Sequence, residues 1–269
     1  MKEKIIASVL FVVAFSVSAT ETFTLVSPCA NATVSAKGGR ILSWKDAAGR
    51  ERLFMPAKPE SAGGDWSHGG VSVCWPWFGR KGDKQSLIHG FARNLVFTLR
   101  GREKTAHGET LTLGAVAPGL DLELAYSLTD KLTMKMTTRN LAASPAEVSL
   151  GIQAYFPVSA YRNIVFSGVK DKDFAAVDGM DKAFGRLGAK FGFRDSGSRR
   201  AVALEAAGNT GLVVWTPGTV EPANRNLAVD DCPRFVVIGP CSRKAEGAVT
   251  LAPGKTHELS CAFKCEDAP

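Results

Sequence analysis

One stretch of the chain gathers side chains that could bind a small molecule. It reads GGVSVCWPWFGRKGDKQSLIHGFARN over residues 69–94. The pattern has neither the period of a helix nor that of a strand, so it predicts an ordered loop, and ordered loops on a rigid scaffold often carry binding residues. Trp75 and Trp77 offer flat apolar rings that could form the wall of a binding groove. The alternative for at least one of the two is a place in the core.

The scaffold that carries this loop is predicted to consist of β-strands. Apolar and polar residues alternate over 120–128, a short turn follows, and the alternation resumes over 132–137, which indicates an antiparallel hairpin with one buried face. No long amphipathic helix is predicted, and only 221–231 looks briefly helical. Further short strands are expected at 40–46, 95–101, 109–115, 147–156, 163–169, 201–206, 211–217, 234–240, 247–251 and 257–263. We therefore expect an all-β sandwich or barrel-like assembly in a single domain.

Residues 1–19 are expected to be an export signal. Lysines precede an apolar run at 5–15, and Val17 and Ala19 fit a cleavage after Ala19. The run is too short to span a bilayer and no second candidate follows it, so we expect no membrane span. The mature protein would be residues 20–269, located in the periplasm or outside the cell.

The cysteines add an expectation about bonding. All six lie after residue 19, and in an oxidising compartment disulfides are the first interpretation, with the pairing left open. One alternative is a zinc site built from His257, Cys261, Cys265 and a fourth cysteine. Another is that Cys74, inside the aromatic loop, is a buried free thiol.

Charge and motifs narrow the expected partners. The formal net charge is +7 and the basic residues are scattered. Nucleic-acid binding would need a basic stripe or a motif, and the sequence contains neither, so no nucleic-acid partner is expected. No phosphate-cradling glycine loop, metal quartet or Ser-His-Asp array emerges, so we expect no cofactor and no metal. We expect a monomer with a small-molecule partner.

Two blocks of the loop are similar to a known signature. GGVSVCWPWFG followed by HGFARN resembles the signature of the hexose-6-phosphate 1-epimerases, a branch of the aldose 1-epimerase, or galactose mutarotase-like, superfamily. Residues 137–159, 211–218 and 234–240 resemble further segments of that family in the expected order. The resemblance implies a galactose mutarotase-like β-supersandwich with a site on one sheet face. It also implies an isomerase whose carbohydrate partner is a hexose or hexose phosphate, opened and reclosed to interconvert its anomers.

That chemistry needs an acid and a base at one sugar ring. The resemblance implies a histidine acid and a glutamate base, and their positions hold Gln153 and Gly239 in this chain. An amide cannot donate and recover a proton near neutral pH, and glycine has no side chain, so we expect Gln153 to contact the substrate only. Two hypotheses follow: an exported 1-epimerase with a rearranged acid and base, and a catalytically silent carbohydrate-binding protein of the same fold.

Three more site positions follow from the resemblance. His89 is retained, is expected to position sugar oxygens, and is our candidate substitute acid; the alternative is a loop histidine satisfied by the backbone. Arg93 resembles an arginine that contacts phosphate or hydroxyl groups, with a surface salt bridge as the alternative. His68 stands where the sugar-phosphate enzymes carry arginine. It lacks the fixed charge and donor fork of arginine, which weakens the expectation of phosphate capture, and it is a candidate substitute base.

Overall fold

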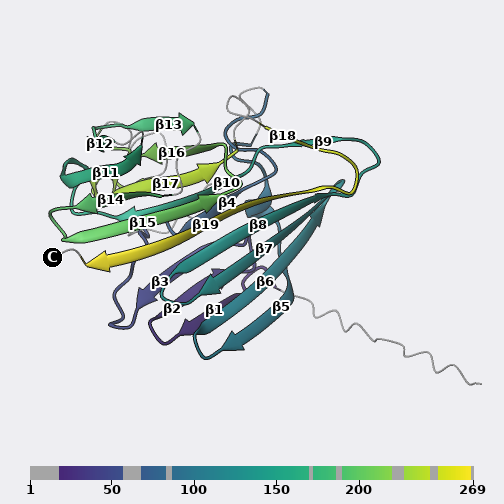
Figure 1. The fold of residues 1–269 in the computed structure, drawn as a ribbon, viewed down its shortest axis with the longest axis horizontal. Helices are drawn as coiled ribbons and strands as arrows, with labels where there is room; N and C mark the ends of the chain where they lie inside the picture. Colours follow the sequence, from purple (N-terminus) through teal and green to yellow (C-terminus); the bar gives the residue numbers. More distant parts are fainter. Residues whose placement is uncertain are drawn as a thin grey trace, which may run out of the picture.

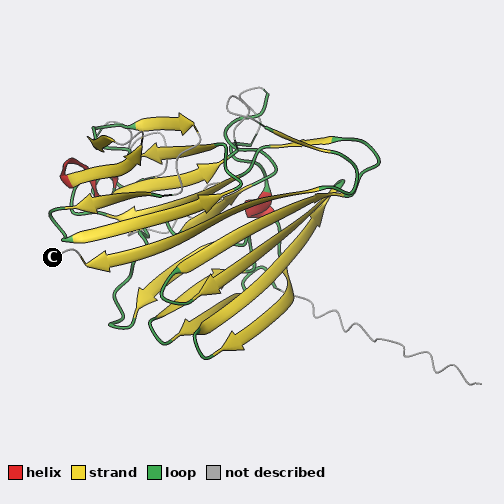
Figure 2. Cartoon of the chain, viewed as in Figure 1, coloured by secondary structure: helices red, strands yellow, loops and turns green. Residues whose placement is uncertain are grey.

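The regular secondary structure of the described residues is almost entirely antiparallel β-strand (Figure 2). The computed structural model describes residues 18–56, 68–82, 87–169, 172–185, 190–219, 227–242 and 248–267. Most of the expected export signal lies outside these residues, and the segment 221–231 is described only from residue 227. Within the described ranges, no helix has the length and apolar character needed to cross a membrane.

Within the described ranges, the elements follow one another as short and long strands with three 3-10 turns. They are β1 (Thr22–Ser27), β2 (Ala30–Ser35), β3 (Ile41–Asp46), β4 (Val71–Cys74), η1 (Ala92–Asn94), β5 (Thr98–Thr105), β6 (Gly108–Ala117), β7 (Leu120–Leu128), β8 (Leu132–Asn140), β9 (Ala146–Val148), β10 (Gly151–Pro157), η2 (Tyr161–Asn163), β11 (Ile164–Val169), β12 (Lys172–Ala175), β13 (Asp181–Gly185), β14 (Phe191–Asp195), β15 (Arg200–Ala207), β16 (Gly211–Trp215), η4 (Cys232–Arg234), β17 (Phe235–Cys241), β18 (Val249–Leu251) and β19 (Thr256–Asp267).

Two large sheets make up most of the described fold. One has eight strands in the order β1-β2-β3-β4-β10-β17-β16-β13, and the other has nine in the order β12-β11-β14-β15-β19-β8-β7-β6-β5. Figure 1 shows β19, in yellow, between β15 and β8, while β9 and β18 form a separate two-stranded ribbon at one end. The expected all-β sandwich is confirmed.

Alternation along the strands places the core between the two sheets. The predicted hairpin is β7 with β8, paired from Leu120 opposite Asn140 to Leu128 opposite Leu132. In β10, Ile152, Ala154 and Phe156 are fully buried in the same core cluster as the inward residues of β7. Because successive side chains of a strand point to opposite faces, the residues between them in β10 lie on the outer face of the eight-stranded sheet.

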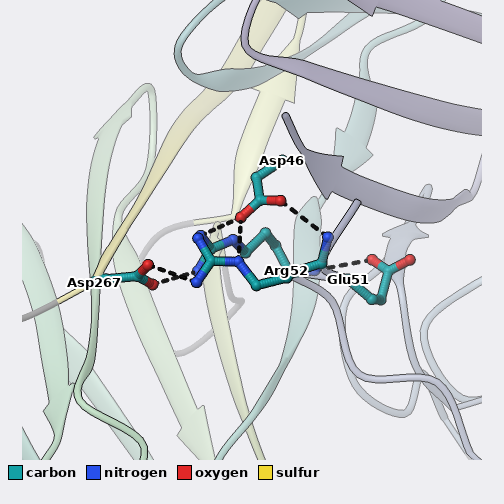
Figure 3. Close-up of polar contacts among 5 residues, drawn as sticks. Asp46, Glu51, Arg52 and Asp267 are labelled. Carbon is teal, nitrogen blue, oxygen red and sulfur yellow. Dashed lines mark hydrogen bonds and ion pairs between the residues drawn. The ribbon is translucent and has the colours of Figure 1, made fainter. Parts of the chain in front are cut away.

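An ionic cluster joins the end of β19 to the loop that follows β3. Figure 3 shows the Arg52 guanidinium, which is nearly buried, donating to Asp46 at 2.5 Å and to Asp267 at 3.0 Å. Arg50 pairs with the same two carboxylates. Partial burial raises the pKa of Asp46, but hydrogen bonds from the Arg50 amide and both guanidiniums outweigh it and lower the pKa from 3.8 to about 2. The cluster anchors the segment that runs on to Phe54, which packs on the outer face of the eight-stranded sheet.

The expected disulfides are not found. All six cysteines lie within the described residues, and each is a free thiol. Cys74 and Cys241 both face Gly151, from the two strands beside it, so they are two strand spacings or roughly 9.5 Å apart. A disulfide needs Cα atoms closer than about 7 Å.

The alternative zinc site is also not formed. Cys261 and Cys265 lie four residues apart on the extended strand β19, which separates them by roughly 13 Å, and His257 lies as far again from Cys261 in the other direction. Among the described residues, no group of three or more potential ligands could hold a metal ion.

Candidate functional site

The outer face of the eight-stranded sheet carries most of the predicted site residues. We call the central part of it the Gln153 face. Its residues point away from the inter-sheet core on β4, β10, β16 and β17, and they are Ser72, Cys74, Gly151, Gln153, Tyr155, Val213, Trp215, Phe235, Val237, Gly239 and Cys241. A second apolar cluster, separate from the main core, lies on this face and includes Tyr155, Trp215 and Phe235.

Gln153 occupies the centre of this face. It pairs with Ser72 on β4, and the register of β10 with β17 places Gly239 on its other side. A Cβ atom built on Gly239 would lie 3.6 Å from Cγ of Gln153. The two positions that the resemblance assigns to the acid and the base are therefore neighbours on one surface.

The side-chain oxygen of Gln153 is left open. The residue is 7% exposed, and no group in the described part of the chain hydrogen-bonds its Oε1 atom. A buried acceptor without a partner costs about 1–3 kcal/mol. A ligand that donated a hydrogen bond to this oxygen would recover that free energy.

The backbone around Gly239 leaves no space for a side chain. The same Cβ atom would lie 2.6 Å from the carbonyl oxygen of Ile152, closer than real Cβ atoms come to backbone. The close approach of β17 to β10 therefore depends on glycine at this position. A glutamate here would require the two strands to move apart.

His68 lies on the same face, one pleat further along β10. It is 3% exposed, its Nδ1 atom lies 3.3 Å from the Tyr155 hydroxyl, and its ring centroid is 5.9 Å from that of Trp215. The Arg40 guanidinium donates to the carbonyls of His68 and Gly69, which fixes the backbone here. The structure thus pairs an imidazole with a phenol in a largely apolar setting, and this pair can form hydrogen bonds with a ligand or exchange protons.

The aromatic loop covers the other end of the face. Phe78 lies over Gly151, where a Cβ atom would come within 2.2 Å of the ring, so glycine is needed beneath it. His89 packs its ring 4.7 Å from Phe78, and its Nδ1 accepts a hydrogen bond from the Gly79 amide at 3.0 Å. The proton of the neutral imidazole therefore sits on Nε2. His89 braces the loop, and Nδ1 is already engaged by the backbone.

Arg93 lies near the same end of the face, on η1. Its charge acts on the thiol of Cys74 at the end of β4. Burial raises the pKa of Cys74, the Cys241 thiol raises it further, and Arg93 partly offsets both. Arg93 therefore supplies positive charge beside the Cys74, Gly151 and Cys241 row of the face.

The two tryptophans of the loop have different places. Trp75 is completely buried in the inter-sheet core, where its indole nitrogen donates to Thr138 at 3.0 Å. This corrects the assignment of Trp75 to substrate binding, because its ring faces away from the Gln153 face. Trp77 is half-buried and donates to the carbonyl of Leu87 at 2.9 Å, so it remains available as a surface residue of the loop.

The structure thus gathers His68, Gln153, His89 and Arg93 around one sheet face, within a few pleats of each other. Sequence reasoning missed Tyr155 and Trp215, which line the His68 end. Tyr155 could have been found, since it lies two residues after Gln153 on a strand and so shares its face. Trp215 comes from β16, and no local signal connects it to His68.

Fold and site together define an antiparallel β-sandwich with a polar site on the outer face of one sheet. The sequence model of the aldose 1-epimerase family matches residues 21–264. The chain therefore belongs to the aldose 1-epimerase family.

Relatives within the family are named for sugar phosphates. An Escherichia coli (strain K12) protein named "Putative glucose-6-phosphate 1-epimerase" is 40% identical over 85 residues, which cover 32% of this chain and only 29% of that protein. A protein of the same name from Cenchrus ciliaris is 23% identical over 262 residues, covering 81% of this chain and 76% of that protein.

Solved structures share the fold. A crystal structure from Salmonella typhimurium titled "putative mutarotase" aligns with a TM-score of 0.81 at 19% identity, covering 91% of this chain and 90% of that chain. A galactose mutarotase-like protein from Lactobacillus casei aligns with a TM-score of 0.71 at 16% identity, covering 91% and 100%. At these identities the likeness concerns the architecture.

Proposed function

We propose that this protein binds a hexose on the Gln153 face and does not interconvert its anomers. The observation that carries the proposal is the pair of neighbouring positions at the centre of the face, an amide at Gln153 and bare backbone at Gly239. The open acceptor of Gln153 fits a sugar hydroxyl as donor, since hydroxyl groups both donate and accept.

The rate contribution of the missing acid and base is large enough to decide between binding and turnover. Opening a pyranose ring needs a base at the C1 hydroxyl and an acid at the ring oxygen. Each such group typically contributes a factor of about 10² to 10⁴ in rate. Without either group in its family position, binding is what the face retains.

An unphosphorylated sugar fits the face better than a hexose phosphate. His68, at the position where the sugar-phosphate enzymes carry arginine, is nearly buried beside Tyr155 and Trp215. An imidazole lacks the fixed charge and the paired donors that arginine presents to a phosphate. We therefore propose glucose- or galactose-type sugars as ligands in preference to their 6-phosphates.

Calorimetry and polarimetry test the two halves of this proposal. We expect glucose or galactose to bind with an affinity at least tenfold above that of glucose 6-phosphate. We also expect α-glucose and α-galactose to mutarotate in weak buffer no faster with the protein than without it. Absence of binding to all three sugars contradicts the first half, and protein-dependent mutarotation contradicts the second.

The His68–Tyr155 contact supports a second candidate function, mutarotation by a rearranged acid and base. The two groups lie 3.3 Å apart on the same face as Gln153. If protein-dependent mutarotation is observed, His68→Phe and Tyr155→Phe should each abolish it under this second candidate. Unchanged rates in both variants would reject the His68–Tyr155 pair as the source.

The place of action is proposed on sequence grounds alone. The apolar run at 5–15 with its small-residue cleavage region supports export into the periplasm or the medium. Mass spectrometry of the protein from cell fractions tests this. A mature N-terminus at Thr20 outside the cytoplasm is expected, and an uncleaved cytoplasmic chain would contradict it.

A further inference from the structure

A cavity of about 120 Å³ lies beside the Gln153 face, on the far side of Phe78. Its walls come from the aromatic loop and from the segment that leads into β10. The lining side chains that matter here are Trp77, Phe78, Arg80, Lys81, Glu147 and Ser149. The cavity could hold several water molecules, since one needs roughly 10–15 Å³ of such space, and its rim is exposed at Arg80 and Lys81.

The cavity continues the line of the proposed sugar site. Ser149, Gly151 and Gln153 follow one another toward the centre of the sheet, and Phe78 stands over the middle one. Four residues of extended chain span roughly 13 Å, so the cavity and the open amide oxygen are further apart than one sugar ring can reach. A ligand that touched both would have to pass over the ring of Phe78.

Trp77 is held in place at the wall of this cavity. Its indole nitrogen donates to Leu87, and its ring meets Phe91 edge-on at 5.6 Å. A short bridge between Arg80 and Ile88 closes the loop around it. The Lys81 ammonium lies 5.5 Å from the ring centroid, on an exposed and flexible side chain that a ligand can displace.

These side chains match the way proteins hold sugars. Aromatic rings such as Trp77 and Phe78 present apolar faces to the C–H side of a pyranose, while a carboxylate and cations at the rim bond its hydroxyl groups. Glu147 and Arg80 are among the residues that line the cavity. The combination differs from the Gln153 face, which offers one open amide and no exposed aromatic platform of this kind among its described residues.

We infer that this cavity is a second carbohydrate subsite, and that the natural ligand is an oligosaccharide running from Gln153 over Phe78 to Trp77. The inference rests on the proposed function for the Gln153 end. It extends the ligand class from a single hexose to a chain of at least two or three linked units.

Affinity measured against chain length tests the inference. Calorimetry would compare glucose with maltose, maltotriose, cellobiose and cellotriose, and galactose with its β-1,4-linked dimer and trimer. In at least one series we expect the trisaccharide to bind tenfold or more tighter than its monosaccharide. In Trp77→Ala that ratio should fall close to one, and Trp77→Phe, which keeps an aromatic face, should retain part of it.

A matched control is Leu99→Ala, which removes an exposed apolar side chain from β5 in the other sheet and should leave the ratio unchanged. Thermal unfolding of each variant verifies that the loop changes leave the fold intact. Monosaccharide binding with a wild-type ratio near one, or a ratio that Trp77→Ala does not lower, overturns the subsite while the proposed function stands. Failure of every sugar in the three series to bind overturns both.

Discussion

Two buried amide side chains, Asn140 and Gln153, show how differently this molecule treats its polar groups. Asn140 is fully buried at the end of β8, and both polar atoms of its side chain have partners: Nδ2 donates to the carbonyls of Ser144 and Leu251 at 2.8 Å, and Oδ1 accepts from the Ala142 amide at 2.9 Å. Gln153 is nearly as buried, but its oxygen has no partner among the described residues. The hydrogen bonds of Asn140 indicate a structural role, whereas the oxygen of Gln153, unpartnered within the described ranges, indicates a role in binding a ligand.

The largest expected effect comes from breaking the completed amide. Asn140→Ala removes the side-chain partner of the Leu251 carbonyl at a buried site, and of the Ser144 carbonyl and the Ala142 amide at part-buried ones. We expect a loss of about 3 kcal/mol in the free energy of unfolding, since each unsatisfied group costs about 1–3 kcal/mol but relaxation recovers part of it. Urea denaturation measures it, and a loss below about 1 kcal/mol would show that Asn140 is not a structural keystone.

Gly239→Ala is expected to have the next largest effect. Its new methyl group would meet the Ile152 carbonyl at 2.6 Å, and overpacking of this kind costs about 1–3 kcal/mol. The control is Gly185→Ala on the edge strand β13, where nothing lies within 4 Å of the added atom. That change should stay within about 0.5 kcal/mol of wild type. Equal stability of the two variants would refute the close approach of β17 to β10.

Gln153→Met turns the open amide into an apolar side chain of similar size. Because the variant removes a buried acceptor that lacks a partner, we expect unfolding stability to be unchanged or higher by about 1 kcal/mol. Sugar binding should be lost. Calorimetry and urea denaturation on the same preparation check both. A destabilised variant that still binds sugar would show that Gln153, like Asn140, has a structural role.

The smallest expected effect is a pH dependence at the ionic cluster, another set of completed polar groups. The Asp46 pKa is lowered from 3.8 to about 2 in the folded protein, so its contribution to stability is complete above about pH 5 and is lost as the pH falls through 3.8 toward 2. Asp46→Asn should flatten the stability curve in that window. Unfolding curves measured at pH 2.5 and 5 for both proteins test this, and parallel pH dependence would exclude Asp46 as the source.

Much of the fold was readable because alternation along a strand reports burial directly. The β7–β8 hairpin is the clearest case. In contrast, β2 escapes prediction because it buries only Ala32 and Val34, which are too small to mark a face. The expected strand 147–156 is divided, because β9 pairs with β18 in a separate ribbon whereas β10 pairs with β4 and β17 in the eight-stranded sheet.

The site could be predicted only in part. The family resemblance points to Gln153 and Gly239, but their contact joins strands 86 residues apart in sequence and emerges only from the register of β10 with β17. The opposite placement of Trp75 and Trp77 was also hidden. Both have the residue type of a sugar-binding wall, and only the packing of the loop on the sheet assigns one to the core.

The difference in exposure among the free thiols allows the protein to be labelled at one site. Cys29 is exposed in the turn between β1 and β2, whereas the other five cysteines are buried or half-buried. Burial raises the pKa of Cys265 to about 12, which suppresses the reactive thiolate even at this half-buried position. Towards a maleimide dye the folded molecule should therefore behave as though it had one cysteine, and a fluorophore attached there would report titrations from the sheet edge, four strands away from β10.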